Sequence, residues 1–261
     1  MQKQIVYGQS SIVNPPRPRL WEVDALRGLA VVAMIIFHFM WDLYFYGLTT
    51  QDIPGSGWQA FARGIGTTFI FVLGLSATLD YNRMIAKGLI PFKRTLQRGL
   101  LVFGCGLIVS AGTYFFVGDE WVRFGILHHA GVAIILAYFF MRLPSPLIAV
   151  IGVAVIALGT YFEGIPGPSP WLIPFGLVPP GMGMVDYYPL LPWFGVALLG
   201  VAFGKIAYAN GARKFTLPDW GQSLPVRLLR FLGRHSLIVY IVHQLIFIGL
   251  IEGAFALGLI T

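Results

Sequence analysis

The chain has 261 residues, of which 57% are hydrophobic and only 11% charged, and its mean hydropathy is +0.75. A soluble domain carries about 25% charged residues, so this composition excludes a soluble globular protein and indicates a polytopic membrane protein. The net charge of +7 comes with no nucleic-acid-binding module, and the single cysteine, Cys105, excludes an internal disulfide.

The N-terminal segment, residues 1–21, is polar and contains three prolines. It has neither the apolar stretch nor the small-residue cleavage site of a signal peptide, so we expect the first span to remain as an anchor. Seven apolar segments follow that approach or reach the roughly 20 residues of a spanning helix. In chain order they are residues 26–46, 61–81, 96–117, 126–141, 146–162, 189–208 and 236–257. The fourth and fifth are short and joined by a tight turn, which predicts a helical hairpin.

The basic residues are distributed unevenly about these spans. Of the 18 lysines and arginines, only Arg63 and Arg123 lie on the side opposite to the N-terminus. Cationic loops are retained in the cytoplasm, so the N-terminus is expected inside and the C-terminus outside. The sequence therefore predicts an all-α bundle of about seven spans, a single domain over residues 1–261. We expect it in the cytoplasmic (inner or plasma) membrane.

The outer loop at residues 163–188 is rich in proline and glycine, which prevents a regular helix throughout. Its residues 174–184 are apolar enough to enter the membrane. Irregular backbone survives there only when it is buried in protein or lines a wet cavity. Two interpretations stay open: a lid or re-entrant wall on the outer side, and a surface loop lying on the bilayer.

The first span carries the main candidate residues. His38 lies eleven residues after Arg27, which places the two roughly 16 Å apart along the helix axis. An ionisable side chain inside hydrocarbon indicates a functional site by default. Asp42 shares a helix face with His38, so it could orient the imidazole and raise its basicity. The alternative is a histidine hydrogen-bonded to a neighbouring helix, beside a solvated Asp42.

Three more histidines lie in spans. His128 and His129 fall in the outer half of the fourth span, near the depth of His38, and they point to different faces, so at most one is expected to join His38. No cysteine or carboxylate stands at ligand spacing, and no metal is expected. His243, in the inner half of the last span, could meet a ligand from the cytoplasm or tie two helices together.

A cluster of cations flanks the cytoplasmic ends of the second and third spans. Arg83, Lys93, Arg94 and Arg98 are expected to lie beside Arg27. A basic mouth opening into an apolar bundle suits a polyanionic ligand with a long, less charged arm, and coenzyme A is such a ligand. Membrane lipid is the other expected partner, because anionic headgroups are attracted to the same cations.

Five stretches of the chain also carry a recognisable pattern. They are residues 19–30 followed by Met34, His38 and Asp42, then 71–76, 124–128, 186–195 and 235–244. In this order, over nearly the whole chain, they resemble the bacterial branch of the heparan-alpha-glucosaminide N-acetyltransferase catalytic-domain family. The spacing of Arg27 and His38 also resembles the first span of membrane acyltransferases that modify surface polysaccharides.

The resemblance implies an acyltransferase that uses acyl-coenzyme A, with acetyl as the expected acyl group, at the cytoplasmic side. The acceptor would be a glycan or another envelope molecule at the outer side. By the same resemblance, Arg27 would contact the coenzyme. His38 would serve the transfer, either as a general base or as a transient acyl carrier.

The remaining candidates complete a predicted site. Asp42 would orient His38, Arg94 and Arg98 would help Arg27 with the coenzyme phosphates, and the coenzyme site would also include His243. The acceptor side would be bordered by Asp186, His128 and His129. Two other classes stay open: a small transporter, which paired broken helices would favour, and a non-catalytic membrane scaffold. The sequence is also compatible with a homo-oligomer of the acyltransferase.

Overall fold

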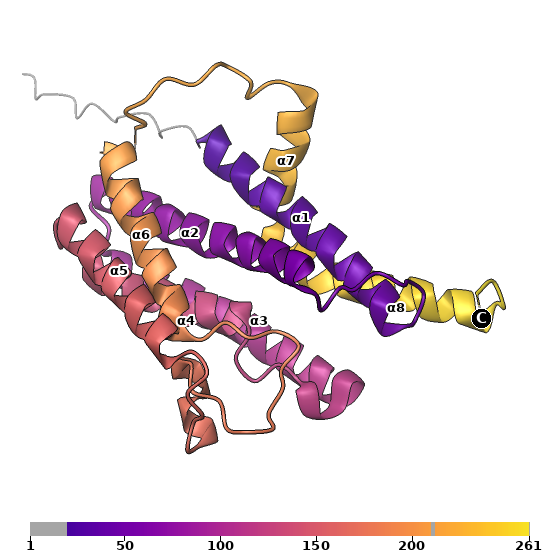
Figure 1. Cartoon of the computed structure of the whole chain (residues 1–261). Helices are drawn as coiled ribbons and strands as arrows, with labels where there is room; N and C mark the ends of the chain where they lie inside the picture. Colours follow the sequence, from indigo (N-terminus) through magenta and orange to yellow (C-terminus); the bar gives the residue numbers. More distant parts are fainter. Residues whose placement is uncertain (1–19, 210–211, 261) are drawn as a thin grey trace, which may run out of the picture.

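The computed structural model describes residues 20–209 and 212–260, and these residues form helices and loops, with no strand among them. The polar N-terminal segment lies, up to residue 19, outside the described residues. In chain order the helices are α1 Trp21–Phe45, α2 Ser56–Ala86, α3 Pro91–Val117, η1 Gly118–Glu120, α4 Ile126–Phe140, α5 Ser145–Phe162, η2 Pro170–Phe175, α6 Leu190–Ala207, α7 Leu224–Arg234 and α8 Ser236–Ala256. The predicted all-α fold is confirmed (Figure 1).

Six of these helices are long and apolar enough to cross a membrane: α1, α2, α3, α5, α6 and α8. The helix α4 is also apolar but has 15 residues, which is about 22 Å of helix against a hydrocarbon core of about 30 Å. The fourth and fifth predicted spans are thus a short helix and an 18-residue one, but they do not pack on each other as the predicted helical hairpin: α4 packs on α2, α3 and α6, and α5 packs on α6. The helix α2 exceeds the predicted span by five residues at each end, because polar residues continue the helix beyond its apolar stretch.

The helix α7 was not predicted from the sequence. It has 11 residues, begins with a proline in its first turn, and carries three arginines. It is too short and too charged to meet the criteria for a span. Its exposed apolar side chains, Leu224, Leu228 and Phe231, lie three or four residues apart and therefore on one face.

The helix α8 runs alongside α1 in the same direction, and its contacts advance together with those of α1: His38 with His243, Asp42 with Gln244, and Tyr46 with Glu252. The helix α7 instead crosses the beginning of α1, and its contacts run in the opposite order, Asp24 with Gly233 and Gly28 with Leu229. Figure 1 shows α7 beside the beginning of α1, and α8 reaching the end of α1 near the C-terminus. Because α1 and α8 are parallel, they end on the same side of the bundle, as an odd number of crossings requires.

The apolar core lies among α2, α4, α5 and α6. Its members include Ile70, Ala133, Ile148 and Leu198, all with 1% exposure or less. Glycines allow close helix approach here, since Gly200 of α6 has its Cα against the backbone of α2. The helix α8 contributes little to this core, and its Leu245 and Leu250 are left exposed for contact with lipid.

The outer loop at residues 163–188 has two parts. The 3₁₀ helix η2 buries Ile173 against the bundle, while its Trp171 keeps 87% of its surface accessible. The last residues of the loop bind the segment before α4, with the amide of Val185 donating to Glu120 O (2.9 Å) and that of Tyr188 to Phe124 O (3.1 Å). The loop thus holds its final residues against the bundle, next to the beginnings of α4 and α6.

Candidate active site

A pair of histidines joins α1 to α8. The Nδ1 atom of His38 lies 2.7 Å from the Nε2 atom of His243. The two rings stack with centroids 4.9 Å apart and planes inclined by 24°. His243 is 7% exposed, whereas His38 is only partly buried. The hydrogen bond to a neighbouring helix that the sequence left open for His38 is therefore present, and its partner is a second titratable side chain.

Asp42 lies one turn beyond His38 and is 4% exposed. Its Oδ1 atom accepts a hydrogen bond of 2.5 Å from the side-chain amide of Gln244. The carboxylate is thus paired with the residue after His243, in a second polar contact between the same two helices. The expected orienting contact from Asp42 to His38 is replaced by the contact from His243.

Asp186 connects the outer loop to both α4 and α8. Its Oδ2 atom accepts a hydrogen bond from the amide of Ile126 (3.0 Å) and another from the hydroxyl of Tyr240 (3.3 Å). Burial raises the pKa of the Asp186 carboxyl from 3.8 to about 6. Tyr240 precedes His243 by one turn, and the two rings are 5.9 Å apart edge to face. The structure therefore places Asp186 next to the histidine pair, through a tyrosine of α8.

The side chain of His128 is turned toward α3. Its Nδ1 atom accepts a hydrogen bond from the amide of Gly125, and its Nε2 atom lies 3.3 Å from the hydroxyl of Ser110. That hydroxyl donates in turn to Val122 O at 2.5 Å. These contacts satisfy polar groups at the beginning of α4, so His128 has a structural part in this fold.

His129 has no exposed surface and lies beside the backbone of Tyr188 and Pro189, where α6 begins. Both adjacent histidines are buried, and they face different neighbours: His128 contacts α3, and His129 contacts the backbone just before α6. Among the contacts of the described residues, neither His128 nor His129 touches His38.

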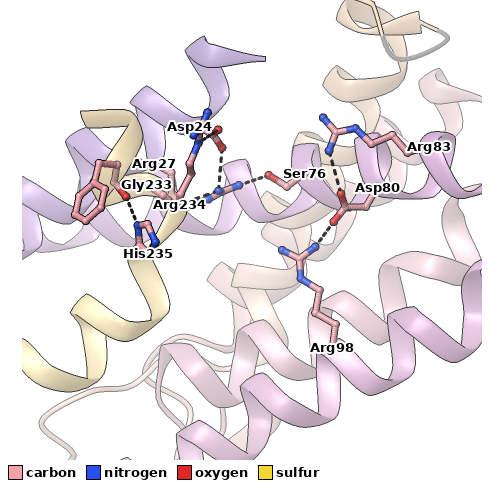
Figure 2. A network of polar contacts seen from close by, with 10 residues as sticks. Asp24, Arg27, Ser76, Asp80, Arg83, Arg98, Gly233, Arg234 and His235 are labelled. Atoms are coloured by element: carbon pink, nitrogen blue, oxygen red, sulfur yellow. Dashed lines mark hydrogen bonds and ion pairs between the residues drawn. The ribbon is translucent and has the colours of Figure 1, made fainter. Parts of the chain in front are cut away.

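Arg27 lies near the beginning of α1 and is held by three elements. Its guanidinium donates to Ser76 Oγ of α2 (2.5 Å) and to Gly233 O of α7 (3.3 Å), and lies 3.6 Å from Asp24. Asp24 also binds Arg234 at 3.1 Å (Figure 2). Arg27 thus joins α1, α2 and α7.

A separate basic cleft opens between α2, α3 and α4. Its mouth has a volume of about 130 Å³ and is lined by Asp80, Arg83, Met84, Lys87 and Arg94. Its inner part, about 30 Å³, reaches Leu73, Ala77 and Ile134 and is also lined by Tyr81, Tyr138 and Arg98. The predicted pair Arg94 and Arg98 is therefore brought together here, whereas Arg27 does not line either part.

The Arg27 cluster and the cleft lie next to each other on α2. Ser76, which binds Arg27, and Asp80, which binds Arg83 at 3.4 Å and Arg98, are four residues apart on one helix face (Figure 2). The sequence argument did not identify Ser76 or Asp80. The sequence did contain a signal for them: two polar residues four positions apart, and therefore on one helix face, at the end of an apolar span.

Tyr240 and Gln244 were also not assigned to the site, although both flank His243 on α8 and both bind a predicted carboxylate. Among residues 20–209 and 212–260, no three histidine, cysteine, aspartate or glutamate side chains are placed to share a metal ion.

A comparison with family models finds one described as heparan-alpha-glucosaminide N-acetyltransferase, catalytic, which matches residues 19–245. The match includes both members of the histidine pair, Asp186, Arg27 and the cleft. A search of curated proteins finds no match.

Proposed function

Because the chain belongs to the heparan-alpha-glucosaminide N-acetyltransferase catalytic family of membrane acyltransferases, we propose that it moves the acyl group of acyl-coenzyme A, which we expect to be acetyl, from the cytoplasm to an acceptor at the outer face. The acceptor would be a glycan or another envelope molecule, and the protein would lie in the cytoplasmic membrane of a bacterium. The observation that supports this most directly is the partly buried His38, hydrogen-bonded to His243 inside the helix bundle.

The basic cleft is the proposed entry for the coenzyme. Arg83, Lys87 and Arg94 at its mouth would bind the phosphates, with Arg98 deeper and Arg27 on the neighbouring face. The lining of the cleft extends along α2 from Met84 to Leu73, which is about 16 Å of helix. One turn beyond Leu73, Phe69 packs in the apolar cluster that contains Met34 and Tyr240. The cleft is thus directed along α2 toward the level of the histidine pair.

The inner cleft is narrow, since about 30 Å³ is the space of one water molecule. A pantetheine arm needs more room, so the coenzyme would have to separate α2 from α3 and α4 on entry. The ion pairs of Asp80 with Arg83 and Arg98 close this region, and phosphates would compete with the carboxylate for the same guanidinium groups.

His38 would perform the transfer by one of two routes. In the direct route it removes the proton from the acceptor hydroxyl or amine, the acceptor atom bonds to the acyl carbon, and the carbon–sulfur bond breaks to release coenzyme A thiolate, which is then protonated. In the two-step route the imidazole first displaces the thiolate and carries the acyl group, and the acceptor then displaces the imidazole while its proton passes to the coenzyme A thiolate. Both routes need one imidazole nitrogen with a free electron pair.

The acceptor would approach from the outer loop. Asp186 and Tyr240 provide a carboxyl and a hydroxyl one turn of α8 from His243. Such groups can bind the hydroxyls of a sugar, and His129 lies close to the same segment. We therefore keep Asp186 and His129 in the proposed acceptor side, while His128 would act only by holding the beginning of α4.

The test is transfer of radiolabelled acetyl from acetyl-coenzyme A to an extract of envelope glycans by the purified protein in lipid nanodiscs. We expect label in the glycan fraction with the unmodified chain and none with His38→Ala. His235→Gln is a matched control, because His235 is exposed at the junction of α7 and α8. A folded His38→Ala protein that keeps full transfer would exclude His38 from the reaction. An unmodified protein that binds acetyl-coenzyme A but transfers no acetyl group would favour a transporter or a scaffold.

A further inference from the structure

The hydrogen bonds of His243 determine which of its nitrogens carries the proton. Its Nδ1 atom lies 2.8 Å from Tyr240 O and 3.0 Å from Val239 O. A carbonyl oxygen can only accept a hydrogen bond, so Nδ1 of His243 must be the donor and must carry hydrogen. In the neutral imidazole the other nitrogen, Nε2, then has a free electron pair and acts as an acceptor.

The protonation of His243 also determines the tautomer of His38, because the two rings share a hydrogen bond. Because Nε2 of His243 is an acceptor, the Nδ1 atom of His38 at 2.7 Å must be the donor. A neutral His38 with hydrogen on Nδ1 has its free electron pair on Nε2. We propose that His243 is a positioning residue that holds His38 in this tautomer, so that Nε2 of His38 is the nitrogen that reacts. This inference rests on the proposed function, because it names the reacting atom of the same site.

The burial of the two rings supports the same assignment, with His243 as the positioning residue and His38 as the reacting residue. His243 is 7% exposed and both of its nitrogens are used, one by the carbonyls of its own helix and one by His38. It therefore has no nitrogen left for a substrate. His38 is less buried and has one nitrogen left. A charged His243 would reverse the donor and acceptor, but an imidazolium inside the span is strongly disfavoured when it lacks an anionic partner.

The same hydrogen bonds also stabilise the positive charge that develops on the His38 ring during transfer. When Nε2 of His38 takes a proton or an acyl group, the ring becomes positive and its Nδ1–H becomes a stronger donor toward Nε2 of His243. The Nδ1–H of His243 remains bound to Tyr240 O and Val239 O. The positive charge is thus stabilised by two carbonyl oxygens through one intervening ring.

The inference can be tested by selective ¹⁵N labelling of the five histidines and nitrogen NMR of the full chain in nanodiscs. The signals of His38 and His243 are assigned from their loss in His38→Gln and His243→Gln. Leucine in His243→Leu fills similar space but accepts no hydrogen bond. Glutamine in His243→Gln offers a side-chain oxygen that can accept from Nδ1–H of His38. His235→Gln again serves as the control.

We expect Nδ1 of His38 to carry hydrogen and Nε2 to carry none in the unmodified protein, in His243→Gln and in His235→Gln. In His243→Leu the hydrogen is expected to distribute over both nitrogens. The value of kcat should fall roughly 100-fold in His243→Leu, the lower end of what a positioned acid–base group contributes. The KM for acetyl-coenzyme A should stay nearly constant, and His243→Gln should recover part of kcat.

Two results would overturn the inference: a His38 that carries hydrogen on Nε2 in the unmodified protein, or a folded His243→Leu protein that keeps the tautomer and kcat of the original. The NMR result does not depend on turnover. If the unmodified protein transfers no acetyl group but shows the expected tautomer, the proposed function fails and the tautomer assignment stands.

Discussion

Gly233 of α7 lies against Gly28 of α1 with no room for a side chain at either position. A Cβ atom added to Gly233 would lie 2.9 Å from the amide nitrogen of Gly28 and would overlap the carbonyl of Asp24. A Cβ added to Gly28 would overlap the carbonyl of Leu229. This close crossing brings Arg27 to Gly233 O. It also fixes where α8 begins relative to α1, and thereby the level at which His243 meets His38.

The glycine contact predicts a sensitive site far from the histidines. Gly233→Ala should destabilise the fold by about 1–3 kcal/mol, the usual effect of an added methyl group where none fits. Gly249→Ala on α8 is the matched control, since nothing lies within 4 Å of its added Cβ. Thermal unfolding in one detergent would compare them. Equal midpoints for the two variants would show that α7 does not pack against α1 in this way.

The ion pairs of Asp80 with Arg83 and Arg98 lead us to expect tighter coenzyme binding when the Asp80 carboxylate is removed. Asp80→Asn removes the carboxylate that holds Arg83 and Arg98. Both cations then become available to phosphate. We expect KM for acetyl-coenzyme A to fall roughly 2- to 5-fold with kcat unchanged, because a partly exposed ion pair is worth up to about 1 kcal/mol. Steady-state kinetics at constant ionic strength would measure this.

The matched control for Asp80→Asn is Asp119→Asn, which changes the net charge equally at the exposed outer 3₁₀ helix η1. Arg94→Gln should act in the opposite direction and raise KM, since Arg94 lines both parts of the cleft. If neither Asp80→Asn nor Arg94→Gln altered KM, the coenzyme would have to enter elsewhere.

Asp186 predicts a pH dependence of stability. Burial raises the pKa of its carboxyl from 3.8 to about 6, so the folded protein favours the protonated form. The stabilisation from this group is fully present below its unfolded pKa and is lost as pH rises through about 6. Asp186→Asn does not titrate and keeps an acceptor oxygen for the amide of Ile126.

Relative to Asp186→Asn, the unmodified protein should therefore lose roughly 2 kcal/mol of stability between about pH 4 and pH 7. Unfolding midpoints at a series of pH values would show it. The same substitution at Asp219, exposed in the loop before α7, is the control. If the unmodified protein and Asp186→Asn differed in stability by the same amount at every pH in this range, the Asp186 carboxyl would not be buried as described.

The sequence determined the class of the protein and most of its helices. A run of about 20 apolar residues is stable in a bilayer as a helix that satisfies its own backbone hydrogen bonds, so the spans follow from hydropathy alone. Their ends were less certain, as the ten additional residues of α2 show, because polar residues continue a helix outside the hydrocarbon. Hydropathy does not predict the short, arginine-rich α7, since its position depends on packing against α1.

The sequence also predicted His38, Arg27 and Asp186 as candidate site residues, because ionisable groups in or beside apolar spans are rare. Only the tertiary structure decided their partners. A contact of 2.7 Å between His38 and His243, 205 positions apart, depends on the rotation and the relative height of two helices. The periodicity of each helix gives the direction of a side chain but not the height of the neighbouring helix. That height is set by the glycine crossing of α1 and α7, which exists only in the assembled bundle.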